Sequence, residues 1–484
     1  MPDVRCRYLW TGEGCCTENA IIKTSDTGTI TSIENLPHEQ SLNCDCFFAM
    51  PSFTDAHCHV SWMAVKAASV DFSGAGSAEE FLSMVESAVS SREQTIVRGE
   101  SFDQNEWAVP EIPSLARLDD VSGDVPVFLR RVCGHSAIVN SAMLRLITAE
   151  SKDINRATGV LQEWASLNFD SMFPHPPEAL SRAFSSVASM VFSKGVTGVC
   201  SMENCRDAAA LLQSELPFDV SIALTDCRMD SIMPGETPSG MVKVFLDGSF
   251  GARNAAVLQP YSDGTTGELI HTDGELLKLL LRCGETGLMP AVHAIGARAL
   301  SQLDRVSHEV FRMLNRGFPI RIEHAEDVSV TWPGSWHPDY HIFSMQPNFV
   351  ERWQGRGGMY DRNLSAERSR KLNPFRTIKS SGFVLGFGSD SMPFDPLYGV
   401  HGAVYHRNSE QSLTVGEALK AYTLDSAFIS GLDHLAVPLR AGRTADIAFL
   451  SGNPFHGLDG IFVEGTMKNG KVVHGMERFP GEIQ

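Results

Sequence analysis

At residues 50–60 the chain reads Met50-Pro51-Ser52-Phe53-Thr54-Asp55-Ala56-His57-Cys58-His59-Val60. We expect this stretch to form a short buried strand that ends in two histidines. Side chains two positions apart on a strand point to the same side, so His57 and His59 can reach one metal ion together, whereas Cys58 points away. A His-x-His pair also occurs by chance, and the alternative is two polar residues at a strand end. The rest of the chain has to decide between these interpretations.

The composition is that of an ordinary globular protein. Of the 484 residues, 43% are hydrophobic and 20% are charged, and the net charge is −18. The negative charge argues against nucleic-acid and anionic-membrane partners. No apolar run is long enough to span a membrane, and the first residues lack the apolar core of a signal peptide, so we expect a cytoplasmic protein. The 11 cysteines follow no disulfide or zinc-ribbon spacing, which predicts reduced thiols.

Two segments at opposite ends of the chain share a pattern of short strands. Residues 1–50 contain alternating apolar segments broken by glycines, and residues 436–484 return to the same pattern. In the second segment, Asn469-Gly470 is a strong signal for a tight hairpin turn. We expect 1–50 and 436–484 to form one small β-domain together, with the remainder of the chain inserted between its two halves.

Residues 51–435 alternate short apolar strands with helical stretches. Strands that alternate with helices pair in parallel through right-handed crossovers. The number of such units predicts an α/β fold of the (β/α)8 TIM-barrel type rather than an open sheet. The stretch from 60 to 190 is longer than two barrel units require, so we expect an inserted subdomain within it.

Several of the predicted barrel strands end in residues that can bind a metal ion. In such barrels the reactive groups stand at the carboxyl ends of the strands. Taken singly, each residue has a plain explanation: a core histidine, a lysine that reaches water, or an aspartate that caps a helix. Taken together they form one ring of ligand types, made of His57, His59, Lys243, His293, His324 and Asp390.

The chemistry of this ring suits a divalent metal. Imidazoles and a carboxylate bind zinc, manganese, iron or nickel, and we take zinc, as one ion or two, as the first candidate. The metal would lower the pKa of a bound water and give a hydroxide nucleophile near neutral pH. A buried lysine tends to lose its proton, and the neutral amine of Lys243 could take up carbon dioxide to form a carbamate that bridges two metals. Asp390 would bind metal, act as general base, and pass the proton to the leaving nitrogen.

These motifs resemble the amidohydrolase superfamily, and in particular its YtcJ-like metal-dependent amidohydrolase family. The resemblance runs in order along nearly the whole chain, through residues 51–59, 99–107, 134–141, 243–253, 292–296, 321–325, 346–348, 388–390 and 441–446. It implies a barrel with a small β-sandwich built from both termini. It also implies a carboxylated lysine bridge at Lys243, a ligand and general base at Asp390, and histidine ligands at His57, His59, His293 and His324.

The resemblance also carries over three candidate substrate contacts, at His135, Arg253 and Asp103. The alternative for Arg253 and Asp103 is a plain structural role. One departure concerns Ala297, which stands where relatives commonly have an aspartate. Position 297 follows His293 by four residues, so its change touches the surroundings of the ligands more than the ligands themselves. We therefore expect altered metal tuning or substrate preference, and not loss of the metal.

The sequence predicts a metal-dependent hydrolase that cleaves the C–N bond of an amide-type small molecule. One alternative is a deaminase of a cyclic amidine or aminated ring, although such sites often use one metal and no bridging lysine. Another is a non-catalytic assembly protein on the same barrel, although such proteins typically lose ligands and all six positions here hold competent residues. We expect a small-molecule substrate and no nucleic-acid or membrane partner, and leave a homodimer open. No motif identifies the substrate.

Overall fold

The computed structural model describes residues 3–35, 44–91, 95–132, 134, 136–225, 240–328 and 336–475. The chain divides into two compact units, one made of residues 1–60 and 188–484 and the other of residues 61–187. The first unit contains a barrel and the strands of both chain ends, and the second contains a separate sheet.

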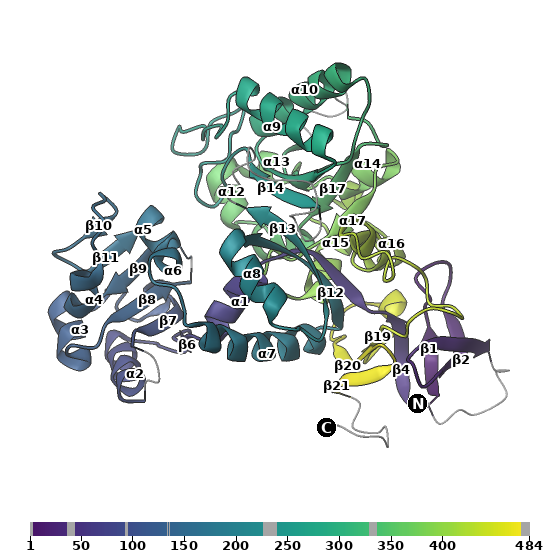
Figure 1. The fold of residues 1–484 in the computed structure, drawn as a ribbon, viewed down its shortest axis with the longest axis horizontal. Coiled ribbons are helices and arrows are strands. Elements are labelled where there is room, and N and C mark those ends of the chain that lie inside the picture. The colour runs from purple at the N-terminus through teal and green to yellow at the C-terminus, as the bar shows by residue number, and fades with distance from the viewer. Residues whose placement is uncertain are drawn as a thin grey trace. The chain divides into compact units, whose positions relative to one another are not determined.

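The barrel sheet has eight strands, all parallel to their neighbours (Figure 1). In sheet order they are β5 (Phe53–Cys58), β12 (Val196–Asn204), β13 (Asp219–Thr225), β14 (Met241–Phe245), β15 (Met289–Ala294), β16 (Ile320–His324), β17 (His341–Met345) and β18 (Leu385–Phe387). The strands are buried almost throughout, as expected for a parallel sheet that is covered on its outside by helices. The predicted (β/α)8 barrel is confirmed.

Helices follow the barrel strands in chain order. They are α8 (Cys205–Gln213), α9 (Asp273–Thr286), α10 (Ala297–Leu314), α11 (Pro347–Trp353), α12 (Met359–Leu364), α13 (Ala366–Ser369), α14 (Phe375–Ser380), α15 (Pro396–Val404), α16 (Val415–Ala421) and α17 (Leu424–Ile429). Helix α9 shows why these segments fold as they do: Thr272 and Glu275 form a capping box at its start, and Gly287 ends it in the left-handed conformation.

The barrel is closed where β18 meets β5, and the contacts that close it come from the site itself. The backbone nitrogen of Asp390 donates to the carbonyl of His57 at 2.7 Å. The buried carboxylate of Asp55 accepts from the backbone nitrogen of Ser389 at 3.0 and 3.1 Å. A Cβ atom at Gly388 would lie 2.3 Å from the backbone nitrogen of His57, so only glycine allows this approach. Closure of the barrel therefore places Asp390 against the His57 strand end.

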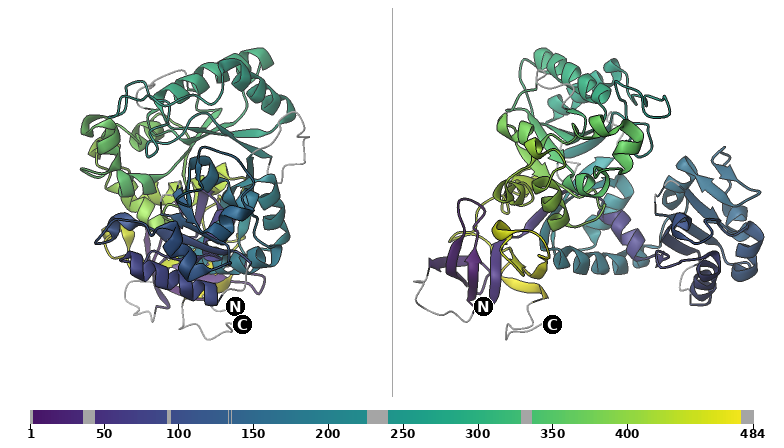
Figure 2. Two further views of the ribbon diagram at one scale, coloured as in Figure 1. Left: turned by 90° about the vertical axis from the view of Figure 1, so that its left-hand side faces the viewer. Right: turned by 180° about the vertical axis from the view of Figure 1, so that it is seen from behind.

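Strands from the two chain ends form one mixed sheet, with purple and yellow strands side by side in Figures 1 and 2. Its order is β21 (Lys471–Gly475), β20 (Val463–Lys468), β19 (Ile447–Leu450), β4 (Cys46–Pro51), β1 (Val4–Leu9), β2 (Thr17–Thr24) and β3 (Ile30–Asn35). The two ends join where β19 pairs antiparallel with β4. The predicted Asn469-Gly470 hairpin connects β20 to β21, with positive φ at both turn residues. The small β-domain expected from both termini is thus present, as seven strands in one sheet.

The second unit, residues 61–187, is the inserted subdomain. Its sheet runs β10 (Ile154–Asn155), β11 (Val160–Gln162), β9 (Ser136–Val139), β8 (Val127–Arg131), β7 (Val97–Phe102) and β6 (Val70–Asp71). Its helices include α2 (Ala78–Ser90), α3 (Leu115–Ser122) and α4 (Ser141–Leu146), each capped at its start by a serine or asparagine side chain.

Within the part of the chain that the structure describes, we find no helix with the length and apolarity that crossing a membrane requires.

Candidate metal centre

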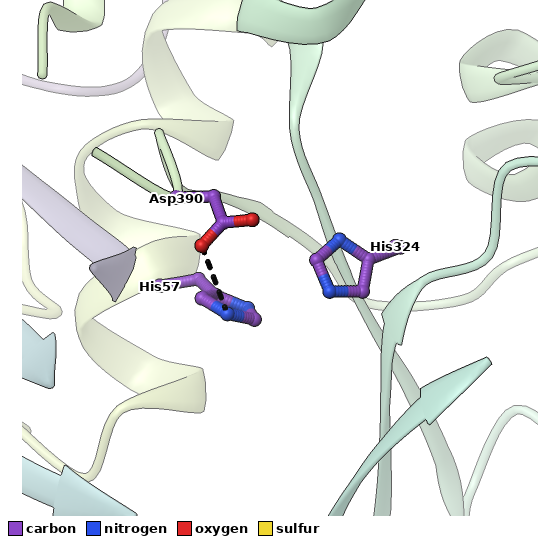
Figure 3. A group of neighbouring side chains, drawn as sticks. All are labelled: His57, His324 and Asp390. Atoms are coloured by element: carbon purple, nitrogen blue, oxygen red, sulfur yellow. Dashed lines mark ion pairs between the residues drawn. The ribbon is translucent and has the colours of Figure 1, made fainter. Parts of the chain in front are cut away.

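Three of the predicted ligands converge at the carboxyl ends of the barrel strands. His57 lies near the end of β5, His324 is the last residue of β16, and Asp390 follows β18. One possible ligand atom from each lies within 4.8 Å of the others. Figure 3 shows the two imidazole rings and the carboxylate arranged around one space.

His57 is held by a carboxylate from another strand. Its Nδ1 lies 2.6 Å from Oε2 of Glu323, and both side chains are buried. Burial alone would raise the pKa of Glu323, but Arg321 and Lys243 hold it below its ordinary value. An ionised carboxylate only accepts, so Nδ1 carries the proton and Nε2 presents a lone pair to the centre. Burial and Lys243 keep the pKa of His57 well below its ordinary value, so the ring is neutral.

Glu323 is in turn fixed by a buried arginine. Arg321 Nε lies 2.7 Å from Glu323 Oε1, and neither side chain is exposed. The same guanidinium donates to the hydroxyl of Ser344 at 3.1 Å, to the carbonyl of Ile429 at 3.2 Å and to the carbonyl of Ala56. The sequence interpretation gave neither residue a role. The available signal was an arginine and a glutamate two positions apart, which share one face of an otherwise apolar strand.

His59 and Asp390 face each other with atoms that are both hydrogen-bond acceptors. His59 Nδ1 donates to the carbonyl of Met202 at 3.1 Å, which leaves the lone pair of Nε2 facing Asp390 Oδ1 at 2.9 Å. Burial opposes protonation of His59, but the Asp390 carboxylate outweighs it and raises the pKa of His59. Two acceptors at this distance need a cation between them, either a proton or a metal ion.

The rings of His324 and His293 lie next to each other at the candidate metal centre. Their ring centroids are 4.4 Å apart, and His324 lies 4.9 Å from the ring of His57. The buried Nδ1 of His324 has no hydrogen-bond partner among the described residues. His293 Nε2 donates to the carbonyl of Gly248 at 3.0 Å, so its remaining lone pair is on Nδ1. His293 is not among the three residues whose ligand atoms group within 4.8 Å.

Lys243 enters the centre from β14. Its Nζ lies 3.3 Å from Nε2 of His57, and only 7% of the residue is exposed. Burial lowers the pKa of Lys243 to about 8, so the ammonium loses its proton more easily than an exposed lysine does.

The backbone at the centre is strained in a way that the alternation of a strand does not predict. His324 and Ala325 have φ of 70° and 50°, and Asp390 and Ser391 have φ of 52° and 59°. Residues other than glycine adopt this region only where the surrounding structure imposes it, and such positions cluster at functional sites.

The side chains present fit a divalent metal ion. Imidazole nitrogens of His57 and His324 and the carboxylate of Asp390 face one space, and the buried Nδ1 of His324 has no hydrogen-bond partner among the described residues. The carboxylate of Glu323 accepts from Nδ1 of His57 and so fixes the orientation of the ring. Histidine ligands in metal sites commonly donate their other ring nitrogen to a carboxylate in this way. This donor set suits zinc and neighbouring transition metals.

A further carboxylate organises the loops beside the centre. Asp247 accepts from the backbone nitrogens of Ala256, Ile295 and Gly296 at 2.9, 3.0 and 2.8 Å. Burial raises its pKa to about 6 although these donors oppose the shift. Asp247 therefore fixes the loop that leads into α10, whose first residue, Ala297, is fully buried. This role of Asp247 was not predicted from the sequence.

Two of the three predicted substrate contacts lie within the described residues, in different units of the chain. Asp103 lies in the inserted unit, where it caps a short helix and pairs with Arg131 at 2.8 Å. Arg253 pairs with Asp263 at 2.9 Å and donates to Asn363 at 3.1 Å, which holds the loop after β14. His135 lies outside the described residues. A substrate role for each stays a prediction.

Comparisons with known proteins agree with this geometry. The model of the amidohydrolase family matches residues 48–474. The YtcJ protein of Bacillus subtilis (strain 168) is 27% identical, over 96% of both chains. The N-substituted formamide deformylase of Arthrobacter pascens is 25% identical, over 88% of each. The crystal structure of an uncharacterized metal-dependent hydrolase from Pyrococcus furiosus matches with a TM-score of 0.75 and 25% identity, over 94% of this chain and all of that one. The chain belongs to the amidohydrolase family.

Proposed function

We propose that this protein is a metal-dependent hydrolase that cleaves the C–N bond of an amide-type small molecule. The observation that carries the proposal is the convergence of possible ligand atoms from His57, His324 and Asp390, with Glu323 fixing the ring of His57. The membership in the amidohydrolase family supports hydrolysis as the reaction class. The Arthrobacter relative acts, by its name, on N-substituted formamides, which places amides first among the substrates to test.

His57, His59, His293, His324 and Asp390 would hold one or two divalent ions, with zinc the first candidate, and Lys243 would bridge two ions as a carbamate. A divalent metal in this position would polarise the substrate carbonyl and make an adjacent water more acidic. The buried carboxylate of Asp390 would accept the proton of the attacking water. The water oxygen would bond to the acyl carbon as that proton leaves. The same carboxylate would then give the proton to the nitrogen as the C–N bond breaks, so that a carboxylic acid and an amine result.

The surroundings of Asp390 support its proposed role as the group that accepts the proton. Asp390 is only 9% exposed, and its Oδ1 lies 2.9 Å from His59 Nε2 and 3.6 Å from His57 Nε2. Burial would raise the pKa of Asp390, but His57, His59 and Lys243 lower it, so the carboxylate is ionised and ready to accept a proton. Removing this carboxylate should lower turnover by at least about a thousandfold, in the range of losses when a group that acts in the transition state is removed.

The test combines metal content with a panel of substrates. Purified chain reconstituted with zinc should hold close to one or two ions per molecule by elemental analysis, and His57→Ala should hold fewer. On N-substituted formamides and other amides, the reconstituted chain should release amine. Asp390→Asn should keep its fold by circular dichroism and lose turnover. A chain that binds no metal, with both variants equal to wild type, would overturn the proposal.

The same panel separates the alternatives. A deaminase would release ammonia from aminated rings or cyclic amidines and leave amides intact. An assembly protein would turn over neither class even with metal bound. The carbamate has its own test: Lys243→Ala should lose activity that short carboxylic acids partly restore, and failure of every such rescue would contradict a bridging role for Lys243.

A further inference from the structure

Three arginine side chains line one cavity that lies apart from the ligand ring in sequence. Arg356, Arg370 and Arg407 border a cavity of about 310 Å³. Arg356 lies between α11 and α12, Arg370 directly follows α13, and Arg407 follows α15. The cavity is therefore built by the connections after β17 and β18, the seventh and eighth strands of the barrel in sheet order.

One of the three arginines is fixed by protein groups. Arg407 is 14% exposed, pairs with Asp361, and donates to the carbonyl of Gln354 at 3.1 Å and to the hydroxyl of Ser369 at 3.3 Å. Its charge is thus balanced by Asp361, and its guanidinium is held as one rigid wall of the cavity.

The other two arginines have no such partner. Across the described ranges, the side chains of Arg356 and Arg370 form no hydrogen bond or ion pair with protein groups. Arg305, by contrast, is exposed and pairs with Asp273 at 2.8 Å. In a chain of net charge −18, two guanidinium groups without a carboxylate partner make this cavity locally positive.

We propose that Arg356, Arg370 and Arg407 form a binding site for a phosphate group, separate from the metal centre. Guanidinium groups donate pairs of hydrogen bonds in the plane that phosphate oxygens require. Three guanidinium groups on one cavity offer more donors than a single carboxylate can accept, which favours a phosphate group. The net negative charge of the chain disfavours a nucleic acid as the carrier of that phosphate.

An acidic residue near the cavity should weaken its affinity for phosphate. An adjoining cavity of about 570 Å³ shares Arg370 and is also lined by Lys371, Glu367 and Glu410. Lys371 and Glu367 pair with each other at 2.9 Å, so Glu410 is the acidic group that reduces the positive charge near Arg370. Removing the charge of Glu410 should strengthen phosphate binding.

The test is calorimetric titration of the full-length, metal-loaded chain with inorganic phosphate. We expect one phosphate per chain at the cavity, with the affinity at least about tenfold weaker in Arg356→Gln and in Arg370→Gln, and stronger in Glu410→Gln. Arg352→Gln is the matched control, because Arg352 is exposed on the neighbouring α11 and covers Trp353 instead of lining the cavity. Its phosphate affinity should equal that of wild type.

Phosphate that binds at the metal centre would survive in Arg356→Gln and Arg370→Gln. Such a result, or no binding by wild type at millimolar phosphate, would overturn the proposal. A second titration with glycerol phosphate identifies the source: equal affinity indicates a phosphate ester, and preference for the inorganic ion indicates free phosphate. The titration measures binding and not turnover, so its result tests the phosphate site independently of the proposed hydrolysis.

Discussion

Two buried arginines each bind a glutamate in this protein, but the two pairs have different consequences. In the barrel, Arg321 and Glu323 are 2.7 Å apart, and the second carboxylate oxygen of Glu323 fixes a predicted metal ligand, His57. In the inserted unit, Arg130 lies 3.0 Å from Glu100 but also 2.7 Å from Asp170. Residue types and burial are alike, so the partners of each pair decide its role.

The protonation of the two glutamates reflects this difference. Arg321 and Lys243 outweigh burial and lower the pKa of Glu323. At Glu100 burial outweighs Arg130 and raises the pKa to about 7, and the charge of Asp170 raises it further. The same type of buried arginine–glutamate contact thus accompanies a lowered pKa at Glu323 and a raised pKa at Glu100.

The largest effect should come from removing the barrel arginine. Arg321→Met leaves Glu323 as a buried charge without its counterion, which should lower the free energy of unfolding by about 3–5 kcal/mol. Urea unfolding of the full chain measures this loss. The double variant Arg321→Met with Glu323→Met removes both charges and should recover much of the stability without recovering metal affinity. If the single variant were as stable as wild type, the Arg321–Glu323 pair would not contribute to the stability of the fold.

A pH series should reveal the opposite behaviour of Glu100. Its folded pKa of about 7 lies above the ordinary 4.5, so the folded chain binds the extra proton between these values and the contribution of Glu100 to stability falls as pH rises through that window. Glu100→Gln cannot ionise, so its stability relative to wild type should rise by up to about 3 kcal/mol from pH 4.5 to above pH 7. Urea unfolding at several pH values checks this. A constant difference between the two proteins would mean that Glu100 titrates normally.

Removing only the charge of Glu323 should separate its effect on the metal from its effect on folding. Glu323→Gln should weaken metal binding by about 10–100-fold, because His57 loses the carboxylate that fixes its protonated nitrogen. Competition with a chromogenic chelator gives the affinity. Ser344→Ala is the control, since Ser344 contacts Arg321 without forming the contact to His57. Equal losses in the two variants would argue against a role for Glu323 in orienting His57.

The smallest effect should come from an arginine–carboxylate pair on the surface. Arg145 and Asp124 lie 2.9 Å apart in the inserted unit with side chains 62% and 99% exposed. Water screens such a pair, so Arg145→Gln should leave thermal unfolding unchanged within error. A clear drop in the midpoint would show that burial is not what distinguishes the other two pairs.

The sequence was informative wherever the signal is local. Alternation of strands and helices predicts the parallel barrel, and Asn469-Gly470 predicts the hairpin of β20 and β21, because turn chemistry and side-chain periodicity act within a few residues. The positions of His57, His324 and Asp390 also follow, since the carboxyl ends of parallel strands meet on one face of a barrel.

The tertiary structure alone decided how the ligands are oriented. Which nitrogen of His57 faces the centre depends on Glu323, which lies 266 positions later in the chain. The positive φ of His324 and Asp390 breaks the two-residue alternation, and the backbone contact of Asp390 with His57 closes the barrel. Proton positions and strained backbone depend on partners that only folding brings together, so a strand pattern determines which residues meet but not which atoms face the metal.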